Sequence, residues 1–302
     1  GLRCSIMREH SLDRLMQPLK RQQKLYVAIP ASVVSDVPHL REKTLKIGWI
    51  GRALAIFRVD EVIVYPDIPE IDQSGDIKFI STILSYLETP QYIRKRIFKI
   101  MPELRYAGIL PPLRTPHHPT KSRKKDLAVN EFREGVVVAE KKGQVLVDIG
   151  VEQPIPVIGV RLPVGTRITV KIVEGGKNPK AALASREEIP IYWGYKVTIS
   201  NTPLGRMMKS REFDTIIATS RYGNPIMDVK DAILDKWRAS RKVLIAFGAP
   251  TQGLHEIVRR EGFELSKLAD FIVNTIPRQG TETVRTEEAI YATLAILNFL
   301  IE

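Results

Sequence analysis

The sequence predicts an α/β protein into which a small β-barrel is inserted. Near both ends of the chain, short apolar runs alternate with helical patterns, as in a parallel sheet covered by helices. Between them, a basic, proline-rich segment leads into five closely spaced β-branched runs. We therefore expect residues 25–111 and 188–302 to form one discontinuous α/β domain, with a barrel at 112–187 and a basic lead-in at 1–24.

The composition is that of a water-soluble globular protein, with 44% hydrophobic and 26% charged residues among 302. No apolar run reaches the roughly 18 residues that a membrane span needs, and no secretory leader is recognisable. The single cysteine, Cys4, cannot form an internal disulfide. It suits a reducing compartment and excludes a cysteine-based zinc site. We expect a cytoplasmic protein.

The net charge of +12 favours a polyanionic partner, of which nucleic acid is the commonest. A merely basic surface is the alternative. The distribution is uneven, because residues 113–187 hold fourteen Lys and Arg against eight Asp and Glu. A quarter of the chain thus carries half of the excess charge.

The first part of the α/β domain begins with a buried strand at 24–30 (KLYVAIP) and a second at 61–65 (EVIVY). Apolar residues between them recur at helical spacing over 40–58, despite Gly48 and Gly51. Two more helices are predicted at 76–87 and 90–101. The second carries Arg94, Lys95, Arg96 and Lys99 on a surface that contacts phosphate or is simply solvated.

The inserted barrel follows a linker at 110–125 (LPPLRTPHHPTKSRKK). Its five predicted strands are 135–139, 144–149, 153–158, 167–173 and 181–185. An OB-like barrel is the first choice and an SH3-like barrel the alternative. Small basic barrels often bind single strands, but Phe132 is the one aromatic residue of these strands and turns. We expect backbone and shape contacts with RNA, or else a purely structural barrel.

The second part of the α/β domain has predicted strands at 213–220, 242–247 and 270–275, with helices at 228–240, 254–261 and 286–301. Because ligands of such sheets bind at the carboxyl ends of strands, three loops are candidates for a site. They are 219–224 (TSRYGN), 247–255 (FGAPTQGLH) and 274–285 (NTIPRQGTETVR).

The three loops differ in how much they indicate. The second contains Gly248 and Gly253 but matches neither the phosphate-binding P-loop nor the dinucleotide fingerprint, so glycine content alone favours a plain turn. The third is long and punctuated by Pro277 and Gly280, which indicates a functional loop. We expect no metal site, because His117 and His118 lie in the linker and His255 stands alone.

Three stretches resemble the SPOUT class of RNA methyltransferases. IGRALAIFRVDEVIV (50–64) resembles the first motif of the class, VLIAFGAPTQGLHE (243–256) is similar to the second, and ADFIVNTIPRQGTETVRTEEAIYATLAILN (269–298) to the third. The inserted barrel and the linker LRYAGILPPLRTPHHP (104–119) resemble an archaeal and eukaryotic subfamily with an OB-like insertion. The likeness covers nearly all of the chain beyond about residue 25.

This resemblance implies a trefoil-knotted α/β domain, an arrangement that sequence pattern alone does not reveal and that is rare in proteins. It implies that S-adenosylmethionine binds bent in the knot and that the protein is a homodimer joined there. The cofactor contacts carried over are Thr219, Phe247, Gly248, Gly253, Asn274, Ile276, Gly280, Thr281 and Val284. Ile276 and Val284 would line an apolar adenine slot.

The resemblance also implies the activity, which is methylation of a uridine ring nitrogen in ribosomal RNA. Arg52 matches the arginine of the first motif and is expected to position RNA or the acceptor base; a surface salt bridge is the alternative. Arg285 has a similar role or braces its loop, and Glu256 caps or orients the glycine loop. The rival function is a non-catalytic RNA-binding or ribosome-assembly factor on a methyltransferase scaffold.

Overall fold

The computed structural model describes residues 16–210 and 212–302 and divides into two compact units. One unit, the barrel unit, comprises residues 16–21, 90–97 and 114–193 of the described chain. The other, the α/β unit, comprises residues 22–89, 98–113 and 194–302. Most of the basic lead-in expected at 1–24 lies outside the described residues.

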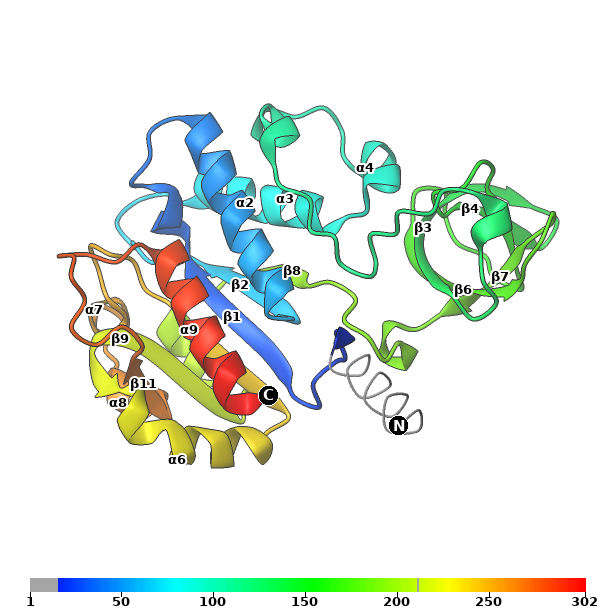
Figure 1. Cartoon of the computed structure of the whole chain (residues 1–302). Coiled ribbons are helices and arrows are strands. Elements are labelled where there is room, and N and C mark those ends of the chain that lie inside the picture. The colour runs from blue at the N-terminus through cyan, green and yellow to red at the C-terminus, as the bar shows by residue number, and fades with distance from the viewer. Residues whose placement is uncertain (1–15, 211) are drawn as a thin grey trace, which may run out of the picture. The chain divides into compact units, whose positions relative to one another are not determined.

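The α/β unit is built on a six-stranded parallel sheet, which confirms the predicted fold class. Its order is β11-β9-β10-β1-β2-β8, so β1, the first strand of the described residues, lies in the interior of the sheet (Figure 1). The strands are β1 (Lys24–Pro30), β2 (Glu61–Tyr65), β8 (Lys196–Ile199), β9 (Thr215–Pro225), β10 (Lys242–Ala246) and β11 (Phe271–Asn274).

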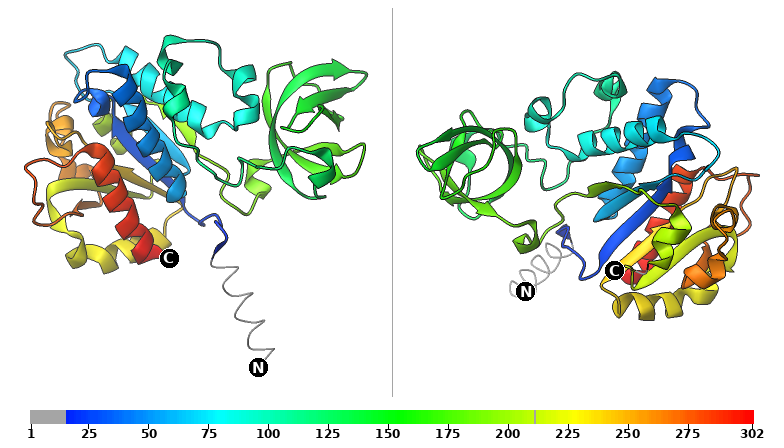
Figure 2. Two further views of the ribbon diagram at one scale, coloured as in Figure 1. Left: turned by 45° about the horizontal axis from the view of Figure 1, so that its top comes forward. Right: turned by 180° about the vertical axis from the view of Figure 1, so that it is seen from behind.

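Helices cover both faces of this sheet, with α2 and α9 on one face and α7 and α8 on the other (Figures 1 and 2). The helices of the unit are α2 (Leu40–Ile56), α3 (Ser74–Glu88), α5 (Leu204–Lys209), α6 (Ile226–Arg238), α7 (Leu254–Arg259), α8 (Leu265–Leu268) and α9 (Thr286–Ile301). Short 3-10 turns occur at Ala31–Val34, Pro102–Leu104 and Ala107–Ile109. Among the described residues, no helix has the length and apolarity needed to cross a membrane.

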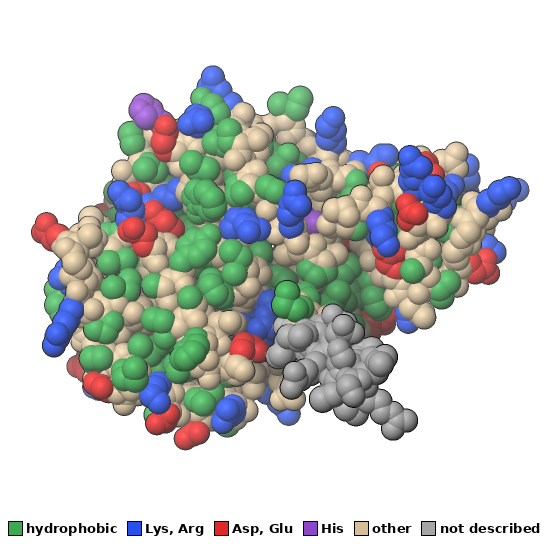
Figure 3. Space-filling view, viewed as in Figure 1, with side chains coloured by type: hydrophobic (Ala, Val, Ile, Leu, Met, Phe, Trp, Pro, Cys, Tyr) green, Lys and Arg blue, Asp and Glu red, His purple; other side chains and the backbone are tan. Residues whose placement is uncertain are grey.

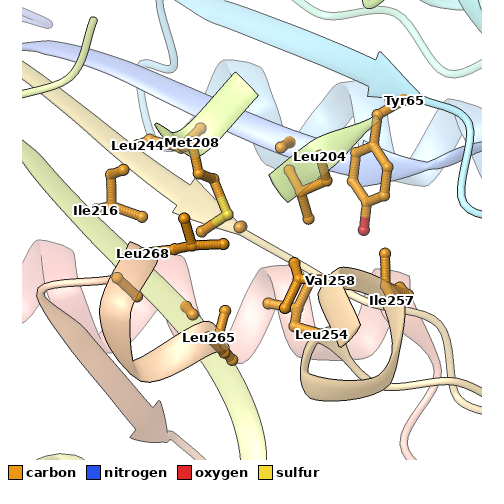
Figure 4. Packing of buried hydrophobic residues seen from close by; sticks show 14 of the residues in the cluster. Tyr65, Leu204, Met208, Ile216, Leu244, Leu254, Ile257, Val258, Leu265 and Leu268 are labelled. Carbon is orange, nitrogen blue, oxygen red and sulfur yellow. The ribbon is translucent and has the colours of Figure 1, made fainter. Parts of the chain in front are cut away.

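Alternate residues of the strands point to opposite faces and are buried on both, because each face is covered by helices. Beneath α5, α7 and α8, strand residues such as Ile216 and Leu244 pack against Leu204, Leu254 and Leu265 (Figure 4). This cluster supports α7 directly beside the carboxyl edge of the sheet.

The two glycines inside α2 are explained by close packing. A Cβ at Gly48 would lie 3.0 Å from the side chains of Leu110 and Pro111, and one at Gly51 would lie 2.7 Å from Leu87. Glycine has a low helix propensity, but larger residues would not fit at these positions because α3 and the 110–113 segment pack directly on the α2 backbone.

The barrel unit contains a closed five-stranded barrel, as the sequence predicted. Its order is β3-β4-β5-β7-β6, with one parallel pairing between β5 and β7 and antiparallel pairings elsewhere. A closed barrel of five strands is compatible with the OB-like barrel expected from the sequence. The strands are β3 (Phe132–Lys141), β4 (Gln144–Asp148), β5 (Ile155–Ile158), β6 (Arg167–Glu174) and β7 (Lys180–Ala184).

A buried carboxylate, Glu134, organises the end of the barrel. The residue is 1% exposed, and its oxygens accept from Arg167 Nη2 at 2.9 Å and from Trp193 Nε1 at 2.9 Å. Arg186 and the hydroxyl of Thr169 complete the cluster. Burial acts to raise the pKa of Glu134, but the two arginines and the hydrogen bonds together lower it.

One predicted helix is shorter than expected and belongs to the barrel unit. Helix α4 covers Gln91–Ile97, whereas the pattern suggested 90–101. Met101 is extended (φ −148°, ψ 150°), which suits a residue before Pro102. Tyr92 of α4 donates to the carbonyl of Glu134 at 2.6 Å, and a Cβ at Gly150 would touch the Tyr92 ring. Its basic residues include Arg96, which pairs with Asp148 at 2.8 Å.

Candidate cofactor site

A cavity of about 600 Å³ opens at the carboxyl ends of β9, β10 and β11, where the sequence placed its three candidate loops. Its volume is typical of small-molecule sites. Its walls come from the end of β9, the glycine loop after β10 with the start of α7, and the segment from the end of β11 to the start of α9. The lining residues are Thr219–Tyr222, Phe247–Thr251, Gly253–Glu256, Arg259, Val273–Ile276, Gln279, Thr283, Val284, Thr286 and Ala289.

Three hydroxyl groups hold the start of the glycine loop. Thr219 Oγ1 donates to the carbonyl of Ala246 at 3.0 Å, the Tyr65 hydroxyl to that of Phe247 at 2.5 Å, and Thr286 Oγ1 to that of Gly248 at 2.9 Å. Three consecutive carbonyls are therefore fixed by three different elements, β9, β2 and α9. Burial raises the pKa of Tyr65 well above its usual value, aided by Asp67 and Glu261, so the group stays a donor.

The rest of the glycine loop closes on itself. The backbone N–H of Ala249 donates to the carbonyl of Gln252 at 3.0 Å, and that of Gln252 donates back to Ala249 at 3.2 Å. A Cβ on Gly248 would lie 3.0 Å from the backbone nitrogen of Leu254, whereas one on Gly253 would meet nothing within 4 Å. Gly248 thus allows the tight turn. At Gly253, which lines the cavity, the space that a side chain would occupy is empty.

The first candidate loop proves to be part of β9. The register with β11 jumps from Ile272–Ala218 to Val273–Asn224, so that residues 219–223 bulge out of the pairing. A Cβ on Gly223 would lie 2.8 Å from the backbone of Ile272 and Val273, so the bulge needs a glycine there. The bulge turns residues 219–222 toward the cavity.

The third loop is tied to the β9 bulge by polar contacts. The amide of Asn274 donates to the carbonyl of Arg221 at 3.1 Å, and its Oδ1 accepts from the backbone N–H of Ile276 at 3.0 Å. Arg221 Nη1 donates to the carbonyl of Glu282 at 3.0 Å, and Gln279 Nε2 to that of Thr281 at 3.0 Å. The loop is thereby folded over one side of the cavity.

Seven of the nine residues named as cofactor contacts line this cavity: Thr219, Phe247, Gly248, Gly253, Asn274, Ile276 and Val284. Gly280 and Thr281 lie in the same third loop but outside the lining. The lining also includes side chains that the sequence reasoning did not single out, above all Tyr222 and Arg259. Tyr222 follows a predicted strand end, a position that could have drawn attention to it.

The two arginines named as catalytic lie outside the lining. Arg52, on α2, is half-buried and donates through Nη1 to the carbonyls of Leu113 at 2.8 Å and Pro112 at 3.1 Å. Arg285 is exposed directly before α9, and its backbone N–H donates to Glu288 at 2.9 Å. Thr286 is the first residue of α9, and its hydroxyl donates to the carbonyl of Gly248. The side chain of Glu256 faces the cavity as part of its wall.

Comparison with known proteins connects this geometry to a family. Residues 24–297 match the model of the family described as "Putative RNA methyltransferase". The chain is 35% identical to the mouse 28S rRNA (uridine-N(3))-methyltransferase over 92% of its own length and 76% of the mouse protein. For the human protein of the same name the identity is 33%, over 92% and 78%. An uncharacterised protein of Halobacterium salinarum is 34% identical over 90% of this chain and 97% of its own.

Proposed function

We propose a specific reaction for this chain, namely transfer of a methyl group from S-adenosylmethionine to the N3 of a uridine in ribosomal RNA. The chain belongs to the family described as "Putative RNA methyltransferase", whose model covers residues 24–297. The observation that carries the proposal is the gathering of seven expected cofactor residues around one cavity. The similarity to uridine-N(3)-methyltransferases of mouse and human supports the choice of target atom.

The cavity suits a nucleoside-like cofactor. Ile276 and Val284 supply apolar surface for a purine ring, and the loops supply backbone polar groups at its edge. The sulfonium of S-adenosylmethionine carries an already activated methyl group. The protein therefore has to orient the acceptor base and allow loss of its N3 proton, and positioning is the larger contribution.

We propose that the acceptor side draws on Arg52, Arg285 and the basic barrel. Nη1 of Arg52 donates to the carbonyls of Pro112 and Leu113, which orients the guanidinium. Its other N–H groups are available as donors to RNA. The barrel segment, 113–187, carries half of the net charge on a quarter of the chain. Such a charge suits sequence-independent binding of the RNA backbone.

We further propose that the α/β unit is a SPOUT domain with a trefoil knot that dimerises through that region. Exposed apolar side chains on α2 and α9 support a partner surface, namely Trp49, Ile56 and Phe299, which are 49%, 49% and 83% exposed. Tyr291 of α9 donates to the carbonyl of Trp49 at 2.7 Å, so the two helices lie side by side. Hydrophobic side chains gather over them in Figure 3.

The reaction is tested by incubating the full chain with ribosomal RNA and methyl-labelled S-adenosylmethionine, followed by digestion to nucleosides. We expect labelled N3-methyluridine. A labelled 2′-O-methyl nucleoside, or no labelled product with any ribosomal RNA, contradicts the proposal. Sedimentation of the pure protein tests the dimer, and a monomer at micromolar concentration contradicts that part.

The alternative function is a non-catalytic RNA-binding factor on the same scaffold, which the basic barrel suits equally. The glycine loop argues for the enzyme, because three separate elements hold a shape that an RNA-binding surface does not need. Calorimetric titration with S-adenosylmethionine separates the two, since only the methyltransferase requires micromolar binding.

A further inference from the structure

Helix α7 presents three ionisable side chains to the cavity. His255, Glu256 and Arg259 all line it, and His255 and Glu256 lie four and three residues before Arg259, so each neighbours Arg259 on the helix surface. In the described part of the chain, none of these side chains has a hydrogen bond or an ion pair with another residue. Glu256 and Arg259 are therefore a separated pair of opposite charges facing the same space.

The charged residues that follow on the chain behave differently. Arg260 pairs with Glu70 at 3.0 Å, and the carboxylate of Glu261 accepts from the backbone N–H groups of Gly205 and Arg206 at 2.7 and 3.1 Å. Neither lines the cavity. These two charges outside the lining are matched within the protein, and Arg221, the third cavity-lining residue with a full charge, is bonded to the carbonyl of Glu282. Glu256 and Arg259 have no such partner among the described residues and remain available to a ligand.

Other parts of the lining are apolar. Ile276, Val284 and Ala289 contribute apolar surface there, and the α7 wall contributes charge. A ligand that fills both sides must therefore have a flat apolar end and an end that carries both a positive and a negative group.

We propose that α7 binds the amino-acid end of the cofactor, with Arg259 holding its carboxylate and Glu256 its ammonium group, while the nucleoside lies toward Ile276 and Val284. This assignment rests on the proposed use of S-adenosylmethionine. Arg259 offers the planar pair of donors that suits a carboxylate. Glu256 offers an acceptor-only group to the ammonium. The pairing fixes which way round the cofactor lies.

The test compares three ligands by calorimetric titration of the full chain. S-adenosylmethionine has both charged groups of the amino-acid end, its decarboxylated analogue keeps only the amine, and 5′-methylthioadenosine lacks the whole end. We expect Arg259→Gln to weaken S-adenosylmethionine about tenfold or more, as loss of a charge-assisted bond does. Decarboxylated S-adenosylmethionine and 5′-methylthioadenosine should bind as to the unaltered protein.

Glu256→Gln should weaken S-adenosylmethionine and its decarboxylated analogue but not 5′-methylthioadenosine. Arg260→Gln is the matched control, because it removes an adjacent cation that faces elsewhere, and it should change no affinity. Equal weakening of all three ligands by Arg259→Gln, or no weakening, overturns this assignment while the methyltransferase proposal stands. If the unaltered protein binds none of the three ligands, both proposals fail together.

Discussion

Replacing Tyr65 by phenylalanine tests how the glycine loop is held. Tyr65 is fully buried, and its hydroxyl donates to the carbonyl of Phe247 at 2.5 Å. The substitution keeps the ring and removes this donor. A buried carbonyl that loses its partner costs about 1–3 kcal/mol, so we expect the free energy of unfolding of the α/β unit to fall by about 2 kcal/mol. Urea titration followed by circular dichroism measures this loss.

A second tyrosine provides the control for this substitution. Tyr195 is also buried, and its hydroxyl donates to the carbonyl of Leu84 at 2.7 Å, which is not part of the cavity. Tyr195→Phe should therefore cost a similar free energy by the same mechanism. The two variants should differ in ligand binding: Tyr65→Phe should weaken S-adenosylhomocysteine several-fold, because Phe247 lines the cavity, and Tyr195→Phe should not.

The result is read from the two measurements together. If both variants lose the same stability and neither changes the affinity for S-adenosylhomocysteine, the Tyr65 hydroxyl stabilises the fold without shaping the cavity. If Tyr65→Phe loses no stability, the short contact carries no net free energy. Either outcome refutes the reasoning.

Three further substitutions follow from the structure. Gly223→Ala places a Cβ 2.8 Å from the β11 backbone, so it should lower the free energy of unfolding by about 1–3 kcal/mol and also weaken cofactor binding. In Gly75→Ala the Cβ meets nothing within 4 Å, so this control should change neither quantity in the same urea and calorimetric assays. Glu134→Gln should lower the stability of the barrel by about 3 kcal/mol. Folding lowers the pKa of Glu134, so its contribution to the free energy of unfolding is present above the unfolded pKa of about 4.3 and is lost as pH falls through the folded pKa. The melting temperature of the variant should therefore change less with acidification than that of the unaltered protein. Arg52→Ala should abolish methyl transfer and leave S-adenosylmethionine affinity unchanged; an equal loss of affinity contradicts the role given to Arg52.

The central strands were predictable because a strand that is buried on both faces has a continuous apolar run in its sequence. The runs 24–30 and 61–65 coincide with β1 and β2. Strand β8 (Lys196–Ile199) was missed, because it lies at the edge of the sheet and none of its four residues is buried. The helices α5 and α8 were missed for a related reason, since four to six residues are too few to show a helical period.

The candidate site was predictable in its segments but not in its contacts. The three loops could be placed at one edge of the sheet by the rule for parallel strands. The roles of Tyr65 and Thr286 could not, because each acts on a carbonyl that lies far away in sequence, 182 and 38 residues respectively. Likewise, the sequence does not show that Arg259 lacks an ion pair with any other described residue, because that depends on where the other charges lie in the fold.

The three hydroxyls on consecutive carbonyls also bear on the order of events during synthesis. Tyr65 leaves the ribosome early, Thr219 much later, and Thr286 only with the last helix of this sequence. The loop between β10 and α7 can reach its final shape only when all three are in place. A nascent chain that has completed its barrel and most of its sheet therefore still lacks a finished cavity. Competence to bind a small molecule is thus a late step of maturation, and cofactor added during refolding should report on completion of the chain's final fold rather than on its intermediates.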